Sequence, residues 1–116
     1  MAQYAVLIYE RVAATDLPPE VTAAHGALPE RIAAHGGRVV AGLAVESPDT
    51  ATSVRGDVVT DGPFVETKEV MAGLYVLEAH DLDHALTLAR MTPIVSGGVE
   101  VRPLLGFEVV ATPEET

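Results

Sequence analysis

Residues 4–9 read YAVLIY, a β-prone run in which apolar side chains fall at both odd and even positions. A strand with one face in water alternates apolar and polar residues, whereas a strand covered on both faces stays apolar throughout. Residues 38–45 (RVVAGLAV) and 71–79 (MAGLYVLEA) share this pattern. The sequence therefore predicts three main strands in a sheet that is covered on both faces.

A first helix is predicted between residues 16 and 37. Asp16 can cap its N-terminus, two prolines can occupy its first turn, where a missing amide does little harm, and the glycines at 36 and 37 can end it. Pro29 lies inside this segment and lacks the amide that a helix interior needs. We therefore expect the helix to be kinked or divided in two at Pro29.

A second, shorter helix follows the third strand. Asp81 can cap it, and Thr92-Pro93 stops it. A last strand is predicted at residues 99–104 (VEVRPL), where apolar and charged residues alternate and leave one side wetter. The residues of this second helix that we expect to face inward are Leu82, Ala85, Leu86 and Ala89.

A small hairpin is predicted between the second and third main strands. Residues 52–55 and 58–60 flank Gly56-Asp57, and a two-residue connection with glycine first suits a type II′ turn. The sequences DGPF and ETKE then follow as a loop.

The order of these elements predicts an α+β fold. Two βαβ halves with right-handed crossovers form a ferredoxin-like βαββαβ arrangement, with both helices on one face of a four-stranded antiparallel sheet and the small hairpin added. The other sheet face is then bare, although the strands are apolar on both sides. We expect a second copy to cover it, which makes a homodimer with a dimeric α/β barrel, and the hairpin can clasp the partner.

Composition narrows the class of protein. A chain of 116 residues with 48% hydrophobic residues predicts a single domain, placed at residues 1–110, with a flexible tail at 111–116. A net charge of −10 without a basic cluster argues against nucleic-acid binding. No apolar run reaches the roughly twenty residues of a membrane span, and no signal peptide is evident, so a cytoplasmic protein is expected. The absence of cysteine excludes disulfides and thiolate metal sites.

Four segments, in order, carry a resemblance to a known family. They are VTDGPFVETKE at residues 59–69, AGLYVLEA at 72–79, DLDHAL at 81–86 and GGVEVRP at 97–103. Together they resemble the DGPF branch of the YCII-related proteins, and the match spans nearly the whole chain. The resemblance implies a bacterial protein with a ferredoxin-like dimeric α/β barrel, commonly a homodimer, and a cleft beside the sheet.

The resemblance also suggests roles. Some relatives look like domains attached to extracytoplasmic-function sigma factors, and another branch includes a protein linked to dechlorination of a hydroxyquinol; fold alone transfers neither role. YCII proteins proper have been suspected of using a His and Asp pair, and His25 occupies a plausible position for the histidine. The expected aspartate is not visible, Ala72 replaces a usual glycine, and Pro29 interrupts a helix that is normally continuous.

The DGPF and ETKE loop offers the first candidate site residues. Asp61 precedes a Gly-Pro turn, where a scaffold can aim its carboxylate into a cleft, although an aspartate before glycine is also a common turn residue. Phe64 can stack on a ligand or plug the loop onto the core. Glu66 and Lys68 can form a charged rim that anchors an acidic or phenolic ligand, or can be a solvated charge run.

The remaining candidates come from other elements. His25 can act as a general base oriented by Asp61, or can be a core histidine. Arg102 can hold a ligand carboxylate, or can pair across strands or across the dimer, and Tyr75 can line the same inter-subunit space. The segment His80 to His84 resembles a metal cluster, but His80 precedes the helix and Asp81 is used as a cap, so we expect no metal.

Two classes of function follow as hypotheses. The first is binding of a small organic molecule in a cleft near the DGPF loop, with cofactorless acid–base chemistry of a lyase or isomerase type in which Asp61 and His25 are catalytic. The alternative is a regulatory or protein-interaction module, for example one associated with a sigma factor, without catalysis. A third hypothesis gives the DGPF segment only the task of clasping the dimer.

Overall fold

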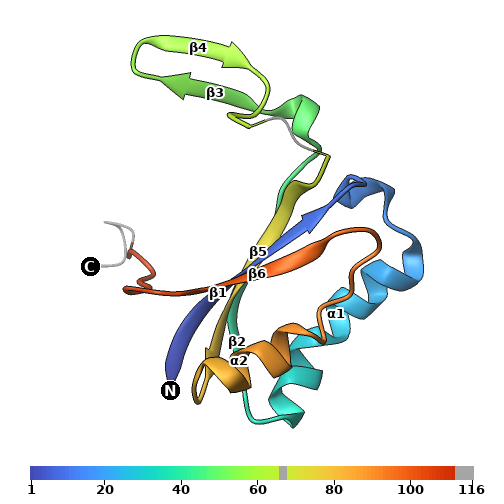
Figure 1. Cartoon of the computed structure of the whole chain (residues 1–116), viewed down its shortest axis with the longest axis vertical. Coiled ribbons are helices and arrows are strands. Elements are labelled where there is room, and N and C mark those ends of the chain that lie inside the picture. Colours follow the sequence, from blue (N-terminus) through green and yellow to red (C-terminus); the bar gives the residue numbers. More distant parts are fainter. Residues whose placement is uncertain (66–67, 112–116) are drawn as a thin grey trace.

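The computed structural model describes residues 1–65 and 68–111. Two α-helices separate the strands of the main sheet, and two short 3-10 helices precede α1 and the hairpin (Figure 1). In chain order the elements are β1 (Ala2–Glu10), η1 (Ala14–Asp16), α1 (Pro19–Ala34), β2 (Arg38–Ala44), η2 (Pro48–Thr50), β3 (Thr52–Arg55), β4 (Val58–Asp61), β5 (Val70–Ala79), α2 (Leu82–Ala89) and β6 (Gly98–Pro103).

The main sheet has four strands in the order β2-β5-β1-β6, and every neighbouring pair is antiparallel. The predicted mixed α+β fold is confirmed, with the strand order that two split βαβ units require. The described residues form an open sheet, not a closed barrel. None of the helices among them is long and apolar enough to cross a membrane.

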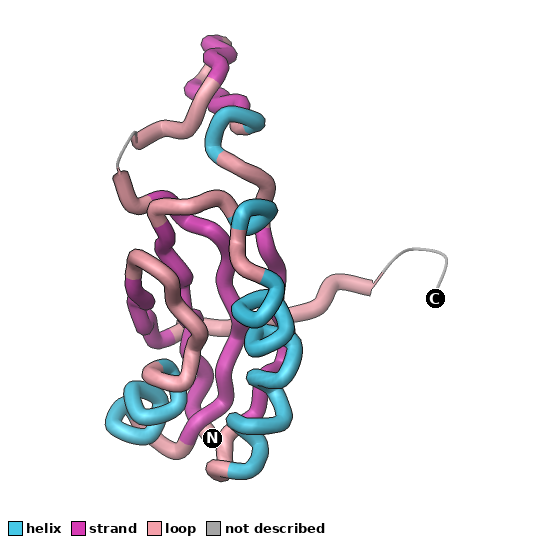
Figure 2. The backbone as a smooth tube through the Cα atoms, turned by 90° about the vertical axis from the view of Figure 1, so that its right-hand side faces the viewer, coloured by secondary structure: helices cyan, strands magenta, loops and turns pink. Residues whose placement is uncertain are grey.

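The core lies between the helices and one face of this sheet. Tyr4 and Val6 of β1 pair across the sheet with Leu77 and Tyr75 of β5, and all four side chains are buried. Residues from both helices complete this cluster, so α1 and α2 cover the same face (Figure 2). The buried helix residues are Leu28, Ile32, Ala85, Leu88 and Ala89.

The opposite face of the sheet has no helix over it among the described residues. Leu7 pairs with Leu74, and Leu74 pairs with Leu43, so three leucines form one row across β1, β5 and β2. Leu43 is 54% exposed. We call the side that carries this row the open face, and its apolar side chains explain why the strand sequences do not alternate.

The hairpin β3–β4 forms a separate two-stranded sheet that projects from the body as an arm (Figure 1). The radius of gyration of 15.8 Å exceeds the roughly 13 Å of a compact fold of this length, as a projecting arm requires. Gly56 has a φ of 58°, and none of the described non-glycine residues has a positive φ. This is the pattern of the predicted type II′ turn, with only its first residue left-handed.

Helix α1 differs from the prediction at two points. It runs unbroken through Pro29, so the expected division into two helices is wrong, and Asp16 lies in η1 while Pro18 is the N-cap. Pro29 removes only the amide that would bond the carbonyl of His25. The helix persists because Leu28 and Ile32, on either side of the proline, are buried in the core.

Helix α2 confirms its predicted cap but not its predicted face. The Asp81 carboxylate accepts a hydrogen bond of 2.8 Å from the amide of His84. The expectation that Leu82 and Leu86 face inward is wrong, because they are 47% and 38% exposed. A helix of two turns buries only one narrow stripe, and here that stripe has the spacing i, i+3, i+4 at Ala85, Leu88 and Ala89.

Candidate functional site

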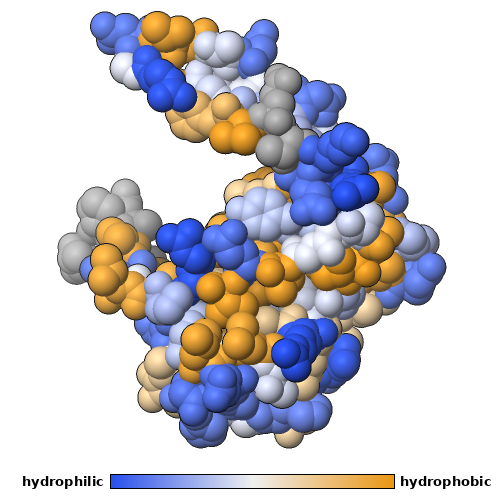
Figure 3. All heavy atoms as spheres, viewed as in Figure 1, coloured by the Kyte–Doolittle hydropathy of each residue, from blue (hydrophilic) through white to orange (hydrophobic). Residues whose placement is uncertain are grey.

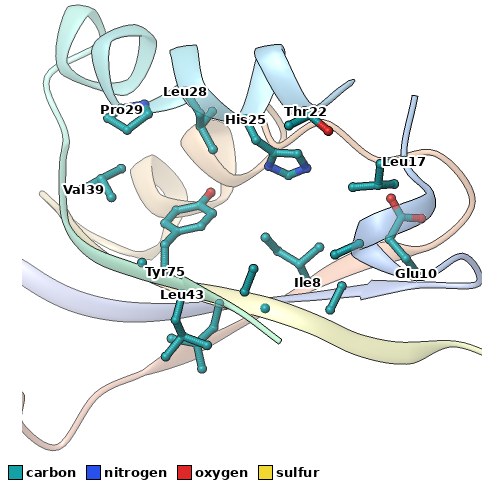
Figure 4. A pocket seen from close by; sticks show the side chains of 16 residues that line it. Ile8, Glu10, Leu17, Thr22, His25, Leu28, Pro29, Val39, Leu43 and Tyr75 are labelled. Atoms are coloured by element: carbon teal, nitrogen blue, oxygen red, sulfur yellow. The ribbon is translucent and has the colours of Figure 1, made fainter. Parts of the chain in front are cut away.

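A cavity of about 380 Å³ lies between α1 and the helix-covered face of the sheet (Figure 4). Its floor comes from β1, β2 and β5, and its roof from residues 22–29 of α1 with Ala14 and Leu17 before that helix. The residues that line it are Ile8, Glu10, Ala14, Leu17, Thr22, His25, Leu28, Pro29, Val39, Gly42, Leu43, Ala44, Ala72, Gly73, Leu74 and Tyr75.

His25 is the most reactive group in this cavity. Its imidazole points from α1 toward the floor, with Tyr75 on one side and Leu17 and Glu10 on the other (Figure 4). Neither ring nitrogen is hydrogen-bonded to another described residue. An imidazole nitrogen without a hydrogen-bond partner in a cavity can take a proton from a bound molecule or donate one to it.

Tyr75 contributes a wall with a restrained hydroxyl. The residue is 5% exposed, and its hydroxyl oxygen lies 2.7 Å from the hydroxyl of Thr92, which is also buried. Burial raises the pKa of Tyr75, and the hydrogen bond between its hydroxyl and that of Thr92 offsets this only in part. Tyr75 therefore stays protonated and presents an apolar ring to the cavity.

Glu10 ends β1 at the rim of the cavity and was not among the predicted site residues. Only 1% of it is exposed. One carboxylate oxygen accepts a hydrogen bond of 2.8 Å from the amide of Val95, and the other accepts bonds of 2.8 Å and 3.2 Å from the amide and hydroxyl of Ser96. Burial alone would raise the pKa of Glu10, but these bonds and one from the Gly97 amide together lower it.

The Glu10 carboxylate holds the loop before β6 in place. We call Glu10 together with residues 95–97 the Glu10 latch. Gly97 passes so close to β1 that an added Cβ would lie 1.8 Å from the carbonyl oxygen of Tyr9. The signal in the sequence is a single glutamate at the end of the apolar run YAVLIYE, together with a Ser-Gly-Gly turn 86 residues later. Neither the glutamate nor the Ser-Gly-Gly turn is distinctive by itself, and only the fold brings the two together.

The described site residues predicted in the DGPF loop do not line the cavity; they lie on the arm or in the loop that follows it. Asp61 is exposed at the end of β4. Phe64 is 63% exposed, and the guanidinium of Arg55 lies 4.8 Å from its ring centroid. Lys68 is exposed, and Glu66 lies outside the described residues. A second hollow, of about 260 Å³, is bordered by Ser53, Arg55, Val58, Thr60, Pro63 and Phe64.

Arg102 lies on the open face of the sheet. It pairs with Ala5, whose side chain points away from the buried face, and its guanidinium donates a hydrogen bond of 3.1 Å to Glu100.

Of the predicted site residues, the structure brings two, His25 and Tyr75, to one cavity. The predicted partnership between His25 and Asp61 would join α1 to the arm, and Asp61 does not line the cavity.

The two histidines flanking the start of α2 are held by hydrogen bonds. The amide of His80 donates to Nδ1 of His84 at 3.0 Å, which leaves Nε2 of His84 to donate to the carbonyl of His35 at 2.8 Å. The two rings stack with centroids 4.7 Å apart. This arrangement joins the end of α1 to α2 and occupies both nitrogens of His84.

Comparison with known proteins gives two findings. The model of the YCII-related domain matches residues 2–108 of the chain. An uncharacterised protein of Rhizobium meliloti (strain 1021) is 46% identical over 50 residues, which is 40% of this chain and 40% of that protein. The chain thus spans less than half the length of this curated relative.

Proposed function

The chain belongs to the YCII-related family, and from this premise we propose that it binds a small organic molecule in the cavity beneath α1. One observation carries the proposal: an imidazole without a hydrogen-bond partner among the described residues points into an apolar cavity of about 380 Å³. Ligand sites are typically apolar hollows of roughly 300–1,000 Å³ with a few converging polar groups. The cavity fits this description.

Proton transfer is the chemistry that these residues support. His25 is the base or acid, since its ring can reach a molecule on the cavity floor. Tyr75 and the aliphatic side chains around it exclude water and hold the molecule against the imidazole. Asp61, which the sequence placed beside His25, lies on the arm and has no part in this cavity. A lyase or isomerase step would therefore rest on His25.

A cavity-filling substitution tests this proposal. Gly42 lies on the floor, and an added Cβ would meet Tyr75 Cβ at 3.6 Å, which is ordinary contact. We expect Gly42→Leu to fill the cavity and to abolish binding of the fragments that a library screen by ligand-observed NMR finds for the wild type. Gly26→Leu is the matched control, because Gly26 is exposed on α1 with open space around its Cβ position and lies outside the cavity. Fragments that still bind to Gly42→Leu would refute the site.

We propose also that the protein is a homodimer whose sheets pack through their open faces as a dimeric α/β barrel. The leucine row of the open face is apolar, and the arm carries exposed apolar side chains. Apolar residues on the arm and on the body border the hollow between them (Figure 3). A second copy seated on the open face would lie within reach of the arm. The exposed apolar arm residues are Val54, Val58, Val59, Phe64 and Val65.

Sedimentation equilibrium tests the dimer. We expect the wild type to sediment as a dimer at micromolar concentration and Leu74→Glu to sediment as a monomer, because the substitution buries an unpaired charge in the centre of the row. Leu82→Glu is the control, since it removes an exposed leucine from α2, away from the open face. A Leu74→Glu protein that remains dimeric would rule out this interface. A monomeric wild type would rule out the homodimer and would favour a different protein as the partner of the arm, as in the regulatory hypothesis.

A further inference from the structure

We infer that the cavity beneath α1 selects uncharged, largely apolar molecules that carry a hydrogen-bonding group at one end. This inference rests on the proposed function, because it names the ligand class of the same site. It departs from the sequence-based expectation of an acidic ligand held by Lys68 or Arg102.

The cavity offers few free polar groups. Among its lining residues, only Glu10, Thr22, His25 and Tyr75 have polar side chains. The Glu10 carboxylate is already bonded to Val95 and Ser96, and the Tyr75 hydroxyl to Thr92. Thr22 and His25 remain.

These two residues lie on one side of the cavity. They are three residues apart on α1, so they share one face of that helix and form the polar end of the cavity (Figure 4). The floor beneath them is apolar and includes Ile8, Val39 and Ala44. A ligand that satisfies both surfaces has an apolar body on the sheet and a hydrogen-bonding group toward α1.

No cationic side chain faces this space. The chain has seven Lys and Arg residues, all within its described part, and none of them lines the cavity. Three are ion-paired elsewhere: Arg11 with Glu69 at 3.6 Å, Arg38 with Glu78 at 3.7 Å, and Arg102 with Glu100 at 3.1 Å. The ionised Glu10 at the rim and the net charge of −10 add repulsion. Lys and Arg thus supply no fixed counter-charge here, and burying an anion without one is unfavourable, so the cavity disfavours a ligand that arrives as an anion.

The start of α1 does not supply the missing positive charge. The free amides of a helix N-terminus can bind an anion. Here Pro18 and Pro19 have no amide hydrogen, and the amides of Val21 and Thr22 donate to the carbonyl of Pro18 at 2.9 Å and 3.1 Å. Of the first four residues of α1, this leaves only the Glu20 amide, and Glu20 does not line the cavity, so the selection for uncharged molecules stands.

Three probes with one ring system test the inference: naphthalene, 1-naphthol and 1-naphthoate, titrated at neutral pH and read by naphthyl fluorescence. The chain contains no Trp, so this signal has little protein background. We expect 1-naphthol to bind at least tenfold more tightly than 1-naphthoate, and several-fold more tightly than naphthalene. We expect His25→Phe, which keeps an aromatic ring but removes the hydrogen bond, to bring 1-naphthol down to the affinity of naphthalene. His25→Gln serves as a second variant if His25→Phe does not fold.

The outcomes separate the inference from the proposed function. If 1-naphthoate binds as tightly as 1-naphthol, and Gly42→Leu abolishes both, the site is real and the inferred selectivity is wrong. If none of the probes binds, or if binding survives Gly42→Leu, the proposed site fails and the inference fails with it. If the wild type prefers 1-naphthol and each of the variants Gly42→Leu and His25→Phe loses this preference, the result supports the inference and the proposed function.

Discussion

The cavity beneath α1 and the projecting arm place similar side chains in opposite settings. At the cavity, Tyr75 and Glu10 are buried and held by hydrogen bonds, and His25 beside them is half-buried. On the arm, Asp61 and Phe64 are exposed on a two-stranded sheet that has no other strand beside it among the described residues. The body thus holds its cavity within a packed core, whereas an isolated two-stranded hairpin is marginal in water without further packing.

Core truncation should show the largest difference between the two regions. Ile32 is fully buried, so Ile32→Ala should lower the free energy of unfolding by about 2–5 kcal/mol. Val54 on the arm is 60% exposed, so Val54→Ala should change the free energy of unfolding by less than about 0.5 kcal/mol. Urea unfolding at low protein concentration measures both. Similar losses for the two variants would mean that the arm is part of the cooperative core.

The Glu10 latch gives the second largest effect. Glu10→Gln keeps the shape of the side chain but removes its charge. Since hydrogen bonds to charged groups are worth about 1.5–3 kcal/mol, we expect the free energy of unfolding to fall by an amount in that range. Glu100→Gln, which removes an exposed charge paired with Arg102, should cost less than about 1 kcal/mol.

The pH dependence of stability identifies this carboxylate more sharply. The pKa of Glu10 in the folded protein lies below its ordinary value of 4.5. The unfolded chain therefore binds the proton first, and the stabilisation by Glu10 is fully present above pH 4.5 and is lost as the pH falls through the folded-state pKa. Wild type should lose more stability than Glu10→Gln when urea unfolding is repeated from pH 6 down to pH 3.5. Parallel curves would contradict the role of the latch.

Much of the fold could be predicted because its signals are local. The apolar strands, the Asp81 cap and the Gly56-Asp57 turn each depend on a few neighbouring residues, and the structure has them all. The errors in the helices have a different cause. Pro29 is tolerated and Leu86 is partly exposed because tertiary packing, not local preference, decides which turns of a helix are held.

The candidate site was harder to predict because it is assembled from distant segments. The sequence drew attention to DGPF, where unusual residues are neighbours, and the structure puts that segment on the arm. His25 lines the cavity, but the sequence argued for it through a partnership with Asp61, which lies on the arm. Glu10 escaped notice because its partners are 85 residues away and donate through backbone amides, which leave little trace in side-chain patterns.

A glycine substitution in the arm tests whether the two regions unfold independently. Gly56 has a φ of 58°, and placing a side chain in this left-handed conformation costs about 1–2 kcal/mol. We expect Gly56→Ala to speed amide hydrogen exchange in β3 and β4 by roughly 5–30-fold, and to leave β1 and β5 unchanged. Gly98→Ala is the control, because its φ is not positive and its Cβ position is open. Faster exchange in β1 and β5 would show that the arm and the body unfold together.

The smallest predicted effect concerns the roof of the cavity. Gly26 lies in the middle of α1, exposed and without heavy atoms near its Cβ position, so it weakens the helix without serving a close contact. Gly26→Ala should therefore raise the free energy of unfolding by about 0.5–1 kcal/mol in urea, through higher helix propensity and a less flexible unfolded chain. Because Gly26 lies outside the cavity, 1-naphthol affinity should not change. A stabilised protein with weaker binding would mean instead that α1 must bend near His25 to admit a ligand, and that the glycine and Pro29 serve this movement together.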